Sequence, residues 1–93
     1  MGKYYLNNTG VVLVLDVGED ITQATDLAIL VKKPDGTRDT WSAVEYTTTE
    51  ISYIIQAGDW DQTGRYYIQS YVKTPSWEGV GEIAYFDIYD NFE

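Results

Sequence analysis

Carboxylates are the only abundant side chains in this sequence that could take part in chemistry, since it holds fifteen Asp and Glu but no His or Cys. Asp59 and Asp61 lie two residues apart, and Asp16, Glu19 and Asp20 form a second group. A Ca²⁺ loop needs oxygens at alternating positions, a central Gly and a distal Glu, and neither group has that spacing. A glycosidase needs two carboxylates across a cleft, for which so short a chain has little room. We therefore predict that these acids cap turns and charge the surface, and that the chain is not an enzyme and holds no metal or cofactor.

The composition excludes further classes of protein. Without Cys there is no disulfide and no thiolate site, and without His the commonest general base is missing. The net charge is −9, and the six basic residues are spread along the chain, so we expect neither nucleic acid nor an anionic membrane as a partner. These basic residues are Lys3, Lys32, Lys33, Arg38, Arg65 and Lys73. No apolar run approaches the roughly 18 residues of a membrane span, and we recognise no secretory signal.

The spacing of apolar residues predicts strands throughout the chain. Residues 66–72 alternate, with Tyr66, Ile68, Ser70 and Val72 on one face. Further strands are predicted at 11–15, 27–33, 38–46, 50–56 and 82–89, and 34–37 is the clearest turn. A helix over 20–26 is the rival interpretation, but seven residues with two Thr make a poor helix. The pattern predicts one all-β domain over residues 1–93, an antiparallel sandwich or small barrel of about seven strands.

The stretch before 66–72 points to one kind of sandwich. This stretch has an acidic corner followed by Gly64, one residue and Tyr66. That is the sequence pattern of a tyrosine corner, in which a Tyr near the start of a strand forms a hydrogen bond with upstream backbone. In immunoglobulin-like sandwiches a buried Trp also packs at the centre of the core, and Trp41 is placed to do so. We therefore predict an immunoglobulin-like sandwich with Trp41 and Tyr66 in its core.

Aromatic side chains are the best candidates for binding. The chain holds nine Tyr and three Trp, and exposed rings at this density usually mark a surface that is covered in use. Trp60 and Trp77 fall in predicted loops, and Tyr67 and Tyr71 fall on the other face of strand 66–72. Protein contact and carbohydrate stacking both fit these four residues. A flat row of three rings on one open face would favour sugar, whereas dispersed rings would favour protein.

Several segments in order resemble a known family. They are Leu15-Asp16-Val17-Gly18, Asp20-Ile21, Val31-Lys32-Lys33-Pro34-Asp35-Gly36-Thr37, Ala57-Gly58-Asp59, Asp61-Gln62-Thr63-Gly64-Arg65-Tyr66 and Gly81-Glu82. Over residues 10–90 the chain resembles small immunoglobulin-like virion proteins of tailed bacteriophages, akin to the N-terminal domain of baseplate upper proteins. The resemblance implies a non-enzymatic structural component of the tail, neck, baseplate or capsid, made in the host cytoplasm and incorporated into the virion. Its partners would be other virion proteins or copies of itself, with carbohydrate binding or adsorption as the alternative function.

One departure from the antibody pattern concerns the link between the sheets. Where Tyr-x-Cys would stand, the chain has Tyr66-x-Ile68, and the partner position on the second predicted strand is near Ile29. We therefore expect the inter-sheet link to be packing of Ile29 and Ile68 against Trp41 rather than a disulfide.

Overall fold

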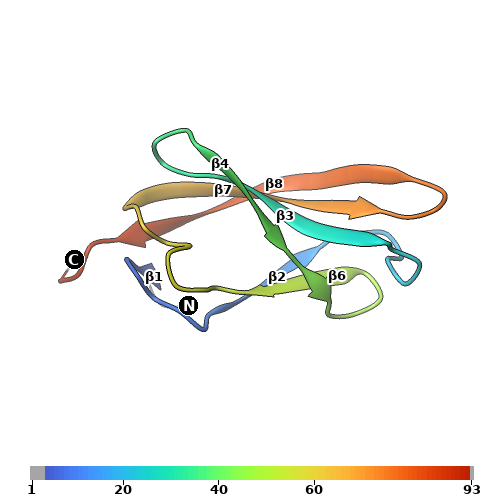
Figure 1. Ribbon diagram of the computed structural model, residues 1–93, viewed down its shortest axis with the longest axis horizontal. Helices are drawn as coiled ribbons and strands as arrows, with labels where there is room; N and C mark the ends of the chain where they lie inside the picture. Colours follow the sequence, from blue (N-terminus) through green and yellow to red (C-terminus); the bar gives the residue numbers. More distant parts are fainter. Residues whose placement is uncertain (1–3, 93) are drawn as a thin grey trace.

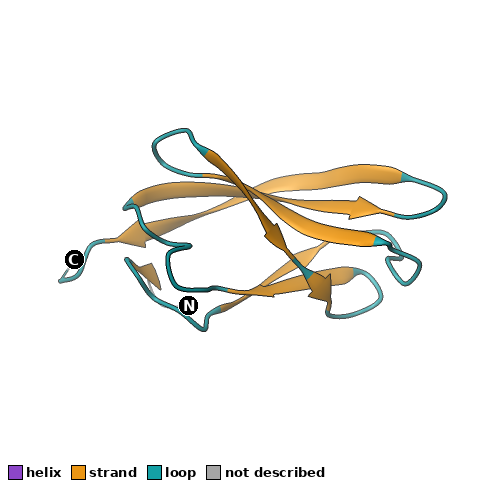
Figure 2. Cartoon of the chain, viewed as in Figure 1, coloured by secondary structure: helices purple, strands orange, loops and turns teal. Residues whose placement is uncertain are grey.

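The protein is built of two β-sheets (Figures 1 and 2), as seen in a computed structural model that describes residues 4–92. These residues form eight strands and no helix. The strands are β1 (Tyr4–Tyr5), β2 (Val12–Asp16), β3 (Asp26–Lys32), β4 (Arg38–Ser42), β5 (Val44–Glu45), β6 (Glu50–Ile54), β7 (Gly64–Lys73) and β8 (Glu78–Tyr89). The all-β prediction is confirmed, and the rival helix over 20–26 is wrong.

The two sheets differ in size. The larger has the order β1-β8-β7-β3-β4, and the smaller has the order β2-β6-β5. Neighbouring strands are antiparallel except for β1, which runs parallel to the end of β8. Figure 1 shows the long β7–β8 hairpin extending along one layer while β2 and β6 form the other. Apolar side chains from both sheets meet in one core.

Strand β7 lies at the centre of the larger sheet, paired with β3 on one side and β8 on the other. Its predicted alternation is confirmed, because Tyr66, Ile68, Ser70 and Val72 are all buried. The residues between them face outward. Since side chains alternate along a strand, this pattern fixes which side chains form the outer surface of the larger sheet.

The turn at 34–37 is confirmed as the connection between β3 and β4. Lys33 N donates to Thr37 O at 2.8 Å, and Gly36 N donates to Lys33 O at 2.9 Å. Gly36 has a φ of 89°, a left-handed value that glycine adopts without strain. The single predicted strand over 38–46, however, divides at Ala43, whose N–H donates to Leu27 O at 3.0 Å. The chain then crosses to the smaller sheet as β5, and such a change of sheet makes a corner of the sandwich.

The predicted strand 82–89 is too short, because β8 already begins at Glu78. A β-bulge lies in β8 opposite Gln69–Tyr71, where the register changes. Gly81 stands at this irregularity, and a Cβ there would come within 2.4 Å of Ser70 Oγ. The bulge interrupts the period-2 pattern and so hides the first part of the strand from sequence inspection.

The predicted inter-sheet link is wrong in its geometry. Ile29, Trp41 and Ile68 are all buried, but they lie on β3, β4 and β7 of the same sheet. The two-residue strand β1 was not predicted from the sequence, so Trp41 lies on the fourth strand rather than the third. The observed aromatic link between the sheets is Trp41 stacked on Tyr53 of β6, with ring centroids 5.0 Å apart and an interplanar angle of 15°.

Trp60 is not the exposed loop residue that we predicted. It is 0% exposed and packs against Tyr4 and Phe86, with ring centroids at 5.1 Å and 5.4 Å. The β6–β7 loop folds its indole over one end of the core, and a Gly58 φ of 87° lies in the turn that leads there. The indole N–H finds no hydrogen-bond acceptor among residues 4–92.

Replacing Trp60 by Ala should lower the free energy of unfolding by about 3–5 kcal/mol, since it removes a fully buried ring. Urea unfolding followed by far-UV circular dichroism measures this. Trp60→Phe serves as the control, because it keeps a ring and removes the unpaired N–H, and it should cost much less. A Trp60→Ala protein as stable as wild type would show that the indole does not support the core.

Candidate functional site

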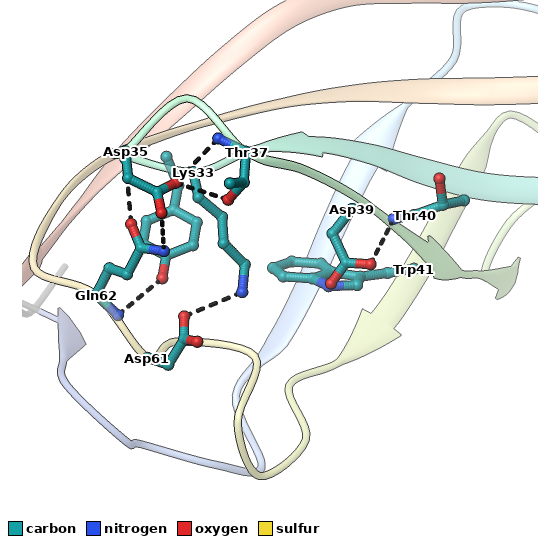
Figure 3. Close-up of polar contacts among 9 residues, drawn as sticks. Lys33, Asp35, Thr37, Asp39, Thr40, Trp41, Asp61 and Gln62 are labelled. Atoms are coloured by element: carbon teal, nitrogen blue, oxygen red, sulfur yellow. Dashed lines mark hydrogen bonds and ion pairs between the residues drawn. The ribbon is translucent and has the colours of Figure 1, made fainter.

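A polar corner joins two loops at one end of the larger sheet (Figure 3), where the β3–β4 turn meets the β6–β7 loop. Lys33 Nζ lies 3.0 Å from Asp61 Oδ1. Asp35 N donates to Gln62 Oε1 at 3.1 Å, and Gln62 Nε2 donates back to Asp35 Oδ2 at 3.0 Å. The two segments that carried much of the family resemblance are therefore bonded to each other.

Tyr66 completes this corner. Its hydroxyl accepts a hydrogen bond from Gln62 N at 3.2 Å, which confirms the predicted bond back to upstream backbone. Burial raises the pKa of Tyr66, so its phenol stays neutral. Gly64 has a φ of 122°, and a Cβ there would lie 3.0 Å from Pro34 Cβ. The corner is thus a close-packed structural joint whose polar side chains bond to one another.

Several carboxylates hold turns and loops in place. Asp20 and Asp35 accept bonds from Thr22 and Thr37, which hold the pKa of each carboxyl below its usual range. Asp59 accepts from Gln56 N and Tyr53 Oη, away from Asp61. Within residues 4–92 no three acidic side chains converge to hold a metal ion. The prediction that acids cap turns is confirmed at Asp20 and at Asp16, which accepts from Gly18 N at 2.9 Å.

The other three predicted interface residues lie apart from Trp60. Tyr67 is 42% exposed on the outer face of the larger sheet, beside Tyr85 at 6.3 Å between ring centroids. Tyr71 is half-buried on the same face, and its hydroxyl donates to Glu78. Trp77 lies in the β7–β8 loop and packs against the core. Only Tyr67 and Tyr71 therefore share a surface.

Strand register gathers cations on this outer face that are far apart in the sequence. Tyr67 lies opposite Lys32, which in turn lies opposite Arg38 on β4. Arg65, on the same face of β7, bonds Asp87 at 2.8 Å and stacks over Tyr85 at 4.1 Å. Our interpretation of the basic residues as scattered is therefore wrong for Lys32, Arg38 and Arg65, because the sheet brings residues that are distant in the sequence side by side.

A hollow of about 430 Å³ opens on this face. Its lining includes Leu30, Lys32, Arg38, Tyr67, Gln69 and Ile83. We call it the outer hollow. Gln69 Nε2 donates to Gly81 O at 2.8 Å, so one N–H of this amide is used within the chain.

The smaller sheet presents a second surface that our sequence interpretation missed. Val14 and Val44 flank Ser52 in one row across the three strands, and Val12 lies opposite Ile54 in the next row. These four apolar side chains are 40–64% exposed, and together they cover Ser52, which is 7% exposed. We call these four the apolar face. The run at 11–15 predicts a strand buried on at least one face. Its outward residues Val12 and Val14 are the signal in the sequence for this second surface.

Comparison with protein-family models, with curated proteins and with solved structures found no match. The resemblance to phage virion proteins therefore stays a prediction. Among residues 4–92 no helix is long and apolar enough to cross a membrane. The outer hollow and the apolar face are two features of residues 4–92 that internal packing does not explain.

Gly64→Ala should destabilise the protein by about 1–3 kcal/mol, because the φ of Gly64 suits only glycine and the added methyl would press on Pro34. Thermal unfolding measures the loss. Gly79→Ala is the matched control, since its Cβ would meet nothing closer than 3.9 Å. Equal melting temperatures for the two variants would contradict the close packing of the corner.

The raised pKa of Tyr53 predicts that the protein loses stability in alkali. Burial and its bond to Asp59 raise the pKa of Tyr53, so the neutral phenol is favoured by folding. That contribution is complete below about pH 10, where an unfolded Tyr ionises, and is lost as pH rises toward the folded value. The free energy of unfolding should thus fall above about pH 10, and fall less steeply in Tyr53→Phe. Urea unfolding across this pH range checks it, and equal slopes in the two proteins would refute it.

Proposed function

We propose that this chain is an immunoglobulin-like, non-enzymatic structural component of a tailed-phage particle, bound to neighbouring subunits through the apolar face. The immunoglobulin-like assignment is supported by the strand order, with β8, β7 and β3 adjacent in one sheet and β2 and β6 in the other. It is also supported by the bond of Tyr66 to the loop before β7. The assignment to a phage particle rests on the sequence resemblance alone.

The observation that carries the binding role is the uncovered apolar face. Its side chains are Val12, Val14, Val44 and Ile54, and the two rows that hold them contain no charged residue. Charge returns to this face only in the next row, where Asp16 lies opposite Glu50, so the apolar side chains form a bounded patch. Contiguous exposed apolar side chains of this kind mark surfaces that another molecule covers.

The edge beside the apolar face favours a protein as the covering molecule. Strand β2 pairs only with β6 among the described strands, so its other edge has unpaired backbone groups. The strand carries no Lys or Pro, the residues with which exposed edges are usually protected from pairing. A neighbouring protein could bond the edge and cover the valines at the same time.

The alternative, carbohydrate binding, has less support. Tyr67, Tyr71 and Tyr85 do share one open face, but the rings of Tyr67 and Tyr85 are tilted by 58° to each other, so they form no flat row. In addition, the Tyr71 hydroxyl donates to Glu78 and Gln69 Nε2 donates to Gly81 O, so two donors of this face are engaged within the chain. Aliphatic side chains rather than rings form much of the outer hollow between them.

A single introduced thiol can test the proposal, since the chain has no Cys of its own. Val44→Cys places the thiol on the apolar face, and Gln23→Cys places it on an exposed loop as the control. Both should react rapidly with a maleimide in the free chain. In particles purified from the phage that encodes the chain, Val44→Cys should react at least about tenfold more slowly and Gln23→Cys at its free rate.

Two outcomes would contradict this proposal. Equal labelling rates for the two thiols in the particle would show that the apolar face stays uncovered. Absence of the chain from the purified particle by mass spectrometry would remove the structural role itself.

A further inference from the structure

The outer hollow is cationic in an acidic protein. Lys32 and Arg38 lie directly opposite each other on β3 and β4, and both are exposed. Like charges placed directly opposite across strands destabilise a sheet. The chain has fifteen acidic residues and only six basic ones. Two cations therefore face each other in a protein whose composition offers many carboxylates that could have paired with them.

No carboxylate within residues 4–92 compensates this pair. The ion pairs among the described residues are Lys33–Asp61 at the corner and Arg65–Asp87 at the edge of the sheet. Neither involves Lys32 or Arg38. An arrangement that breaks a local rule of sheet stability without internal compensation is expected where a ligand supplies the missing group. The ligand therefore contains an anionic group.

The remaining walls of the outer hollow require an apolar group beside that anion. Leu30 is half-buried, Ile83 is 66% exposed and Tyr67 is 42% exposed. A volume of about 430 Å³ is enough for one large side chain. The chemistry that fits is an aromatic side chain with a carboxylate one or two residues away.

One described segment of this chain has that chemistry. Residues 90–92 follow β8, with Asp90 two residues before Phe92, which is fully exposed. The three residues span at most about 11 Å. Tyr67, at the near wall of the hollow, lies opposite Tyr85, roughly 14 Å back along β8 from Tyr89, and Ile83 lies roughly 20 Å back. The backbone of the segment therefore ends short of the hollow of its own molecule.

We propose that the outer hollow binds segment 90–92 of a second copy of this chain. Phe92 enters between Tyr67 and Ile83, and the Asp90 carboxylate pairs with Arg38 and Lys32. This contact joins two different surfaces, so it is heterologous and propagates into a ring or a filament. It uses the opposite sheet from the apolar face and does not rest on the proposed function.

A synthetic peptide of residues 88–93 tests the site on the folded, ¹⁵N-labelled chain. Saturable chemical-shift changes are expected at the backbone amides of Lys32, Arg38 and Tyr67. Arg38→Glu should weaken peptide binding at least about tenfold, because it removes one charge-assisted bond and adds repulsion. Lys73→Glu is the matched control, with a cation of the same face outside the hollow, and should leave binding within about twofold. A peptide in which Phe92 is replaced by Ala should not bind.

Several results would overturn the proposal. One is the absence of shift changes at millimolar peptide. Another is equal weakening by Arg38→Glu and Lys73→Glu, which would indicate only a general charge effect. Shifts at the same amides with polygalacturonate but not with the peptide would assign the hollow to an anionic glycan. Circular dichroism of each variant confirms folding, and Arg38→Glu should be at least as stable as wild type because it relieves the repulsion with Lys32.

Discussion

The close approach of Gly64 to Pro34 is the constraint on which the outer surface of the larger sheet depends. It holds the β6–β7 loop against the β3–β4 turn, where Asp35, Gln62 and Lys33 add polar bonds. Strand β7 begins at this joint, so the joint fixes the register of β7 against β3. A slip of one residue would turn Tyr67 into the core and Tyr66 out of it. The corner thus positions surface chemistry without taking part in any.

Sequence reasoning succeeded where local chemistry and tertiary packing agree. The alternation over 66–72, the turn at 34–37 and the bond of Tyr66 to its own loop are short-range features, and all three were predicted. Features set by distant partners were missed. Strand β1 has two residues and exists because it pairs with the end of β8, and the strand over 38–46 divides because the chain changes sheets at Ala43. Trp60 has a loop-like sequence context, yet its burial depends on Tyr4 and Phe86.

The candidate surfaces show the same division. Tyr67 and Tyr71 could be assigned to one outer face from their spacing alone. The juxtaposition of Lys32 with Arg38, and of Val14 with Val44 around Ser52, depends on strand register and could not be read from spacing. In both places the sheet gathers side chains that are individually unremarkable. One face then offers apolar area beside an open strand edge, and the other offers uncompensated positive charge beside aromatic and aliphatic walls.

We propose that this domain works while neighbouring subunits cover it. The decisive measurement is an electron cryo-microscopy map of purified particles in which mass spectrometry finds the chain. Our account predicts density for the domain as part of a symmetric assembly, with subunits in contact with Val14 and Val44 on one sheet. Density in which the domain projects freely, with the apolar face open to solvent in every copy, would contradict it.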